Sequence, residues 1–243
     1  IREWPMLRNV VFIGAPGVGK GTFAGLICKT TGWSTISVGE KMREEVRTGT
    51  ELGLKIAERL KNGELIEDEV VNTLAFKHLN ANRQPTVKGD FGRGVILDGF
   101  PRTVGQSEAL VRHCEGKVEQ ILAVNIRLDD EITMKKLLGR RLCEKCRRSF
   151  NTAHIVEGCY DMPAILPSTG SCGDETDCKL VKRDDDTPES IKNRFAEYVQ
   201  KTTPIIKFFE DRGLLEHFDV KKGVKDTPAL LDKIVRRLSN VHS

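Results

Sequence analysis

The chain has 243 residues, of which 39% are hydrophobic and 30% are charged, a composition typical of an ordinary globular protein with a sizeable core. Its 39 basic and 35 acidic residues leave a net charge of only +4. This balance argues against a nucleic-acid-binding protein, which usually carries a concentrated basic face, and it suits a phosphate-rich ligand bound in one cleft. No apolar run approaches the roughly 20 residues that a membrane-spanning helix needs.

The seven cysteines are unevenly spaced, since five of them crowd into residues 143–178. An odd count without regular spacing argues against a secreted disulfide scaffold. We therefore expect a reducing compartment, with the cytoplasm as the default. The chain starts at Ile1 rather than Met, so targeting to an organelle or an assembly by a preceding segment stays an open alternative.

The order of apolar runs and amphipathic stretches predicts an α/β fold with a parallel sheet covered on both faces. Short runs rich in Val and Ile indicate buried strands at 9–13, 94–97, 120–127 and 214–220. Helical periodicity is found at 20–30, 51–61, 67–80, 104–114, 129–142, 188–212 and 227–238. Two insertions interrupt this alternation: a helical one at 38–79, and a Gly- and Pro-containing one at 143–180 with little helical period, typical of a lid or binding loop.

A glycine-rich segment follows the first predicted strand and opens the first predicted helix. It reads GAPGVGKGT from Gly14 to Thr22, and so contains the phosphate-loop pattern G-x-x-x-x-G-K. Its glycines would let backbone N–H groups close around phosphate oxygens at the helix N-terminus. Lys20 is expected to reach the β- and γ-phosphates, and Thr22 to face Mg2+ and phosphate oxygens. A turn that merely caps the helix is the weaker alternative.

A second buried strand ends in an acid and is followed by a conspicuous basic residue. Asp98 closes the strand, and Gly99, Phe100, Pro101 and Arg102 follow. An acid at the end of a strand beside a phosphate loop can hold Mg2+ through water, and an arginine after it can bind a second anion bidentately. An ordinary surface ion pair of Arg102 is the weaker alternative.

From about residue 7 to about residue 238, the chain resembles the adenylate kinases, a family of nucleoside monophosphate kinases. Besides the two segments above, the resemblance rests on motifs in the family's order and spacing: Ser37-Val38-Gly39-Glu40 with Arg43, Gly139-Arg140-Arg141, Arg183-Asp184-Asp185-Asp186 and Asn193-Arg194. It implies a P-loop three-layer α/β/α core at 1–37, 80–138 and 183–243, an AMP-binding insertion at 38–79 and a lid at 139–182. It also implies a monomer that transfers the γ-phosphoryl of ATP to AMP with Mg2+, giving two ADP.

The resemblance assigns roles to matching positions. The catalytic group would be Lys20, Asp98, Arg102, Arg140, Arg183 and Arg194. ATP would be bound by Gly17, Val18, Gly19, Lys20, Gly21, Thr22, Lys136 and Arg140, with Mg2+ held by Thr22 and Asp98 through water. AMP would be bound by Val38, Arg43, Glu64, Leu65, Ile66, Gly99, Phe100, Pro101, Arg102 and Gln106, with Gln106 at the adenine edge. Several arginines suit this chemistry, because a phosphoryl in transfer spreads negative charge over its equatorial oxygens.

The nucleotide sites depart from the family pattern in two places. Val38 and Glu40 replace the usual Thr and Asp, and the lost hydroxyl is expected to weaken AMP binding without abolishing activity. Lys136 stands where many relatives place an Arg against the ATP adenine. Lysine lacks the planar group for stacking, so the donor base stays open.

The predicted lid is longer than the usual zinc-bearing one. Cys143-x-x-Cys146 is followed by Cys172 and Cys178 instead of a second C-x-x-C pair. One reading is a relaxed four-thiolate structural Zn2+ site, in which His154, Cys159 or Asp177 could substitute; the other is an inherited half-site that binds no metal. His154 is expected to be a surface or packing residue. Segments 150–154 and 160–163 resemble lids of a plant- and protist-like branch of the family.

Three functions remain to be separated. The first is an ATP:AMP kinase that maintains nucleotide balance. The second is a related kinase with another donor or acceptor, such as GTP with AMP, or UMP or CMP in place of AMP. The third is a kinase domain kept as a structural or nucleotide-sensing subunit of an assembly. A GTPase is not expected, because the chain has no N-K-x-D guanine-reading motif.

Overall fold

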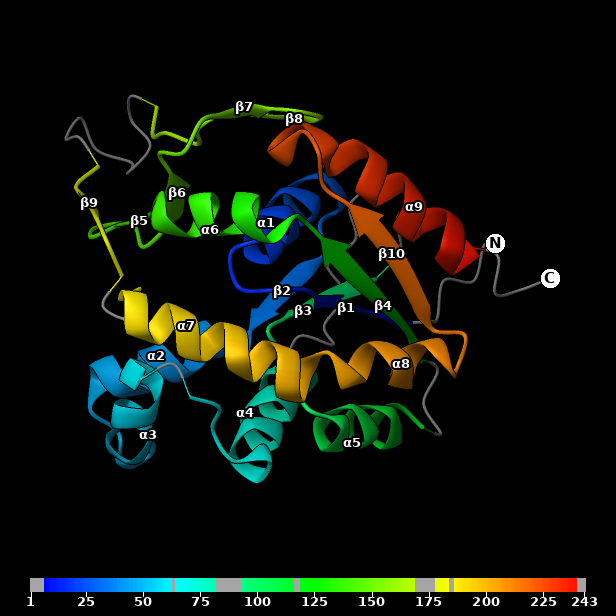
Figure 1. The fold of residues 1–243 in the computed structure, drawn as a ribbon. Helices are drawn as coiled ribbons and strands as arrows, with labels where there is room; N and C mark the ends of the chain where they lie inside the picture. Colours follow the sequence, from blue (N-terminus) through cyan, green and yellow to red (C-terminus); the bar gives the residue numbers. More distant parts are fainter. Residues whose placement is uncertain are drawn as a thin grey trace.

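A computed structural model describes residues 7–62, 64–81, 93–115, 119–168, 178–183 and 186–239. At its centre lies a five-stranded sheet in the order β10-β4-β1-β3-β2, whose neighbouring strands are all parallel (Figure 1). Its strands are β1 (Leu7–Ile13), β2 (Ser34–Ser37), β3 (Gly94–Asp98), β4 (Glu119–Arg127) and β10 (Leu215–Asp219). The predicted parallel sheet is confirmed. The sequence did not reveal β2, because this four-residue edge strand has no apolar run.

Alternate residues of the strands pack on opposite faces of the sheet, as the two-residue period of a strand requires. In β1, Val10 and Phe12 belong to one core cluster, whereas Val11 and Ile13 belong to the other. Helices α1 (Lys20–Thr31) and α9 (Thr227–Ser239) cover the first face, and α4 (Asp68–Ala81), α5 (Val104–Cys114) and α8 (Pro204–Glu210) cover the second (Figure 1). The three-layer α/β/α architecture is therefore confirmed.

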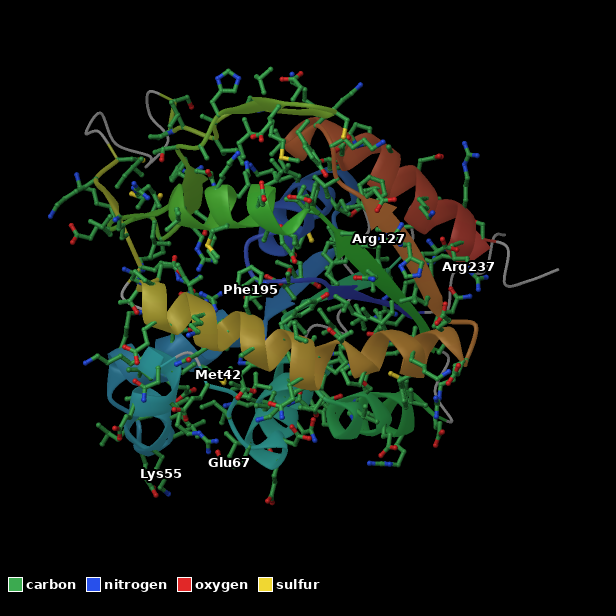
Figure 2. All side chains as sticks on the ribbon, viewed as in Figure 1. Met42, Lys55, Glu67, Arg127, Phe195 and Arg237 are labelled. Carbon is green, nitrogen blue, oxygen red and sulfur yellow. The ribbon has the colours of Figure 1, made fainter. Side chains whose placement is uncertain are left out.

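At the carboxyl ends of β4 and β10, an exposed ion pair joins the two strands. Arg127 donates two hydrogen bonds to Asp219, of 2.7 and 2.8 Å. Figure 2 labels Arg127 at the end of β4. The parallel pairing of Arg127 with Asp219 in the strand register places these side chains together. The carboxyl end of the sheet also carries the residues that form the candidate site.

The insertion after β2 is helical, as predicted. It consists of α2 (Val38–Thr48), α3 (Glu51–Asn62) and α4, and α2 begins directly after the last residue of β2. Figure 1 shows α2 and α3 standing away from the sheet, while α4 runs back toward α5.

The segment between α6 (Asp130–Leu138) and α7 (Pro188–Glu197) forms short strands. These are β5 (Arg140–Cys143), β6 (Ser149–Asn151), β7 (Ile155–Glu157), β8 (Tyr160–Met162) and β9 (Leu180–Val181). The predicted helix at 129–142 is too long, because the chain leaves the helix at Gly139 and pairs as β5 with β6 and β9. Ile155 and Met162 of the β7–β8 hairpin are buried in the same core cluster as α1 and α9.

The predicted helix at 188–212 is interrupted. After α7, residues Tyr198–Thr202 form a π-helical turn, η2, in which Thr203 N donates to Tyr198 O at 2.8 Å. Pro204 then starts α8, and its missing N–H prevents an unbroken α-helical ladder at this point. A short 3-10 helix, η3 (Gly223–Asp226), connects β10 to α9. Within the described ranges, every helix is too short or too polar to cross a lipid bilayer.

Candidate active site

The glycine-rich loop connects β1 to α1 at the carboxyl end of the sheet. Gly14, Gly17 and Gly19 have φ angles of 149, 96 and 101°, which side chains other than glycine rarely adopt. Lys20 is the first residue of α1, and its Nζ donates to the carbonyl oxygens of Gly14 and Ala15 at 2.7 and 2.9 Å. The loop thus carries its lysine inward, at the start of a helix whose N–H groups favour anions.

Gly21 departs from the general phosphate-loop pattern, which has Ser or Thr directly after the lysine. A Cβ atom at Gly21 would lie 2.9 Å from Asp98 Oδ2, so glycine lets this carboxylate approach the start of α1. Asp98 reaches this position because β3 pairs with β1 in parallel. Thr22 lines the same cleft one position further along.

A cleft of about 620 Å³ opens over this end of the sheet. All residues predicted to bind ATP line it: Gly17, Val18, Gly19, Lys20, Gly21, Thr22, Lys136 and Arg140. The remaining predicted catalytic residues line it as well: Asp98, Arg102, Arg183 and Arg194. Residues from β1, β3, β5, α1, α6 and α7 thereby meet around one space.

Two of the arginines are held by one carboxylate. Asp186, with 5% of its side chain exposed, accepts a 2.9 Å hydrogen bond from Nη1 of Arg194 on α7. It also binds both Nε, at 2.7 Å, and Nη2 of Arg140, which opens β5. The family motif Arg183-Asp184-Asp185-Asp186 includes Asp186 but did not reveal this bridging role, and Asp184 and Asp185 lie outside the described residues.

The charges in the cleft act on Lys20. Its pKa is lowered from 10.5 to about 7, first by burial and then by the positive charges of Arg102, Arg194 and Arg140, whereas Asp98 opposes the shift. These arginines must therefore lie near the lysine, although they come from distant parts of the chain. Such a concentration of cations in a partly water-excluded space is suited to a ligand of high negative charge.

The Arg102 side chain is folded against its own loop. Arg102 Nε donates to Gly99 O at 2.9 Å. A Cβ atom at Gly99, where φ is 75°, would lie 2.9 Å from Arg102 Nη2, so a larger residue would displace the guanidinium. Arg43 on α2 is ion-paired with Glu40 at 3.0 Å and lines the same cleft.

A second cavity of about 50 Å³ adjoins the first and shares Arg43, Leu65, Gly99 and Arg102 with it. Most residues predicted to bind AMP line one or both: Arg43, Glu64, Leu65, Ile66, Gly99, Pro101, Arg102 and Gln106. Val38 and Phe100 line neither cavity, and both are buried in the core, 1% and 0% exposed. Their assignment as AMP contacts stays a prediction.

Two of the arginines that line the cleft have no counterpart in the sequence-based assignment. Arg147 and Arg148 follow Cys146 directly and line the cleft from the turn between β5 and β6. Arg147 adopts a φ of 58°, and Arg148 Nε lies 3.4 Å from Cys146 Sγ. In the sequence, the position of these two arginines directly after the Cys143-x-x-Cys146 pair is the signal that could have identified them.

Three of the four predicted zinc ligands lie together. The Sγ atoms of Cys143, Cys146 and Cys178 are all within 4.8 Å of one another. Tetrahedral thiolates with Zn–S bonds of about 2.3 Å are about 3.8 Å apart, so sulfur atoms this close are compatible with a shared zinc ion. Cys172 and Asp177 lie outside the described residues. His154 and Cys159 are exposed and, among the residues the structure describes, do not join the cluster.

Comparison with known proteins identifies the family. The family model described as adenylate kinase matches residues 12–214. An adenylate kinase from Thermotoga neapolitana is 35% identical, over 95% of this chain and 98% of its own. Adenylate kinase 1, chloroplastic, from Arabidopsis thaliana is 37% identical, over 96% of this chain and 80% of its own length. A GTP:AMP phosphotransferase from Plasmodium falciparum is 35% identical, over 90% of this chain and 92% of its own length. The chain thus belongs to the adenylate kinase family and is a phosphotransferase.

Proposed function

We propose that this protein catalyses the reversible, Mg2+-dependent transfer of the γ-phosphoryl of ATP to AMP, giving two ADP, and thereby maintains nucleotide balance. The observation that carries the proposal is that Arg102, Arg140 and Arg194 line one cleft with Lys20, whose pKa is lowered first by burial and then by their charges. Phosphoryl transfer needs this arrangement because its catalysis is mainly positioning and charge stabilisation.

The cationic side chains would have different roles in binding the phosphates and in transfer. Lys20 would bind the β- and γ-phosphates at the loop, and Arg43 and Arg102 would hold the AMP phosphate. Arg140, Arg183 and Arg194 would stabilise the charge on the equatorial oxygens of the phosphoryl during transfer. Asp186 keeps two of these guanidinium groups at the cleft before the substrates arrive.

Mg2+ would be held by Thr22 and, through water, by Asp98. Support comes from the Asp98 carboxylate beside the start of α1 and from the lining of the cleft by Thr22. Oxygen ligands of this kind are those that Mg2+ prefers. When bound, the ion neutralises phosphate charge.

The AMP-binding insertion and the lid would move relative to the core. In this proposal, residues 38–79 bind AMP, residues 139–182 form the lid over ATP, and 1–37, 80–138 and 183–243 form the core. Support comes from Arg43, Leu65 and Arg140, which face the shared cleft from these segments. Closure would exclude water, which would otherwise hydrolyse ATP.

The lid would belong to the plant- and protist-like type and would hold structural Zn2+ through Cys143, Cys146, Cys172 and Cys178. The relatives from Arabidopsis and Plasmodium support the first part, and the clustered sulfur atoms support the second. We also propose a monomer in a reducing compartment. Two similar Arabidopsis kinases are named chloroplastic, which makes an organelle the alternative to the cytoplasm.

GTP in place of ATP is the second candidate donor. Lys136 lines the cleft and is 9% exposed, and burial lowers its pKa. An ammonium group can donate to both the N7 and O6 acceptors of guanine. The Plasmodium relative named GTP:AMP phosphotransferase supports this alternative.

The proposal is tested by measuring ADP formation from ATP with AMP, UMP, CMP or GMP, and then with GTP as donor, at equal concentrations. We expect the highest kcat/KM for ATP with AMP. A higher kcat/KM for GTP would move the assignment to a GTP:AMP kinase. Absence of turnover with every pair would support a structural or nucleotide-sensing subunit and contradict the proposal.

A further inference from the structure

Asp68, the first residue of α4, binds two side chains at the start of α5. Its Oδ2 accepts from Thr103 Oγ1, and its Oδ1 accepts from Gln106 Nε2, both at 2.7 Å. Thr103 is also the N-cap of α5, because its Oγ1 accepts from Gln106 N at 3.1 Å. One carboxylate thus connects the helical insertion to the loop that carries Arg102.

The other end of the Gln106 amide is engaged as well. Its Oε1 accepts from Arg102 N at 2.8 Å, and the residue is only 1% exposed. A carboxylate only accepts hydrogen bonds and a backbone N–H only donates them. A flipped amide would place oxygen against the Asp68 carboxylate and NH2 against the Arg102 N–H, losing both bonds. The orientation of the amide is therefore set by its two neighbours.

After these two bonds, the Gln106 amide still has one N–H and one oxygen lone pair with which to bind a ligand. Gln106 lines the second cavity together with Arg43 and Arg102, where the acceptor nucleotide is proposed to bind. Adenine offers an amino donor beside a ring-nitrogen acceptor, which matches an adjacent oxygen and N–H. A 6-oxopurine carries an oxygen acceptor in place of the amino group, and this oxygen would face the amide oxygen.

We propose that Asp68 is a positioning residue that determines acceptor specificity: by fixing the Gln106 amide, it selects AMP against 6-oxopurine monophosphates. The inference rests on the proposed function, in which Gln106 faces the acceptor base. Asp68 itself need not touch the nucleotide.

The test is the ratio of kcat/KM for AMP to kcat/KM for inosine monophosphate, with ATP as donor, in the wild type and in Asp68→Asn. Asparagine has nearly the same shape but can present either oxygen or NH2 to Gln106, so only the Arg102 N–H still favours one orientation of the amide. We expect the ratio to fall by about tenfold, mainly through the KM values, as the loss of a hydrogen-bond preference implies. Because both measurements use the same preparation, the ratio does not depend on the fraction of folded enzyme.

Glu69→Gln is the matched control, since it removes one negative charge from the same first turn of α4. We expect its AMP-to-inosine ratio to equal that of the wild type. If Asp68→Asn does not fold, Asp68→Ser replaces it, because a hydroxyl also donates and accepts. An unchanged ratio in the Asp68 variant would overturn this inference, whereas a wild type without AMP-dependent ADP formation would overturn the proposed function instead.

Discussion

Lys20 is a side chain whose protonation should respond to nucleotide binding. With a pKa of about 7 in the nucleotide-free protein, it is mostly neutral at pH 8.5. A bound triphosphate favours the ammonium form and raises the pKa, so binding at pH 8.5 should take up about one proton, whereas binding at pH 6 should take up none through Lys20. Isothermal titration calorimetry with ATP, in buffers of different ionisation enthalpy, measures the number of protons taken up on binding. Lys20→Arg, which stays charged, should lack the uptake; equal uptake in both proteins would contradict the pKa.

Asp186 should contribute strongly to stability as well as to the site. Its side chain is 5% exposed and holds two guanidinium groups, so Asp186→Asn leaves both cations without their carboxylate. We expect a loss of about 2–3 kcal/mol in the free energy of unfolding, measured with urea. Asp161→Asn is the matched control, because Asp161 pairs with Lys225 on the surface, with both side chains more than half exposed. That variant should lose much less stability, because an exposed ion pair is screened by solvent, and equal losses would contradict the bridging role of Asp186.

The π-helical turn η2 between α7 and α8 places Thr202 against the Arg102 loop. Thr202 is 7% exposed, and its Oγ1 donates to Arg102 O at 3.0 Å. Thr202→Val should raise the KM for AMP about fivefold, because the peptide that carries Arg102 loses a hydrogen bond of about 1 kcal/mol. Thr203→Val is the control, since the exposed Thr203 hydroxyl donates to Tyr198 O at 3.2 Å within the turn. The same KM in both variants would show that η2 does not position Arg102.

Strands β5, β6 and β9 bring the cysteine cluster together and allow a direct test for metal. Protein purified without chelator should contain about one Zn2+ per chain, measured by mass spectrometry. Removal of the metal should lower the melting temperature, because a structural ion binds only the folded form. A zinc content far below one per chain, with no change of melting temperature on chelation, would favour the inherited half-site.

Much of the molecule could be predicted from the sequence because its strongest signals are local. The buried runs of β1, β3 and β4 predicted the parallel sheet, which the structure confirms, and the glycine-rich loop predicted a phosphate site at its carboxyl end. Family motifs then predicted most of the lysines and arginines that line the cleft. The structure adds that residues from both insertions line one cleft together with the glycine-rich loop.

The missing parts depend on long-range contacts that no local pattern records. The end of α6 at Leu138 depends on pairing of β5 with β6 and β9, and β2 exists only as an edge of the completed sheet. The Asp68–Gln106 bond joins residues 38 positions apart, and the Arg140–Asp186 bond joins residues 46 positions apart. Neither pair could be identified from residue type or spacing alone.

The whole molecule brings Lys20 and several arginines to one cleft, where we propose that phosphoryl transfer takes place, and Lys20→Met tests this arrangement most directly. The measurement is kcat for AMP-dependent ADP formation from ATP, with circular dichroism to confirm the fold. We predict a loss of about a thousandfold or more, because a charge at the transferring phosphates is removed while the core stays intact. A folded variant with near-normal kcat would contradict the central role of the glycine-rich loop and its ring of cations.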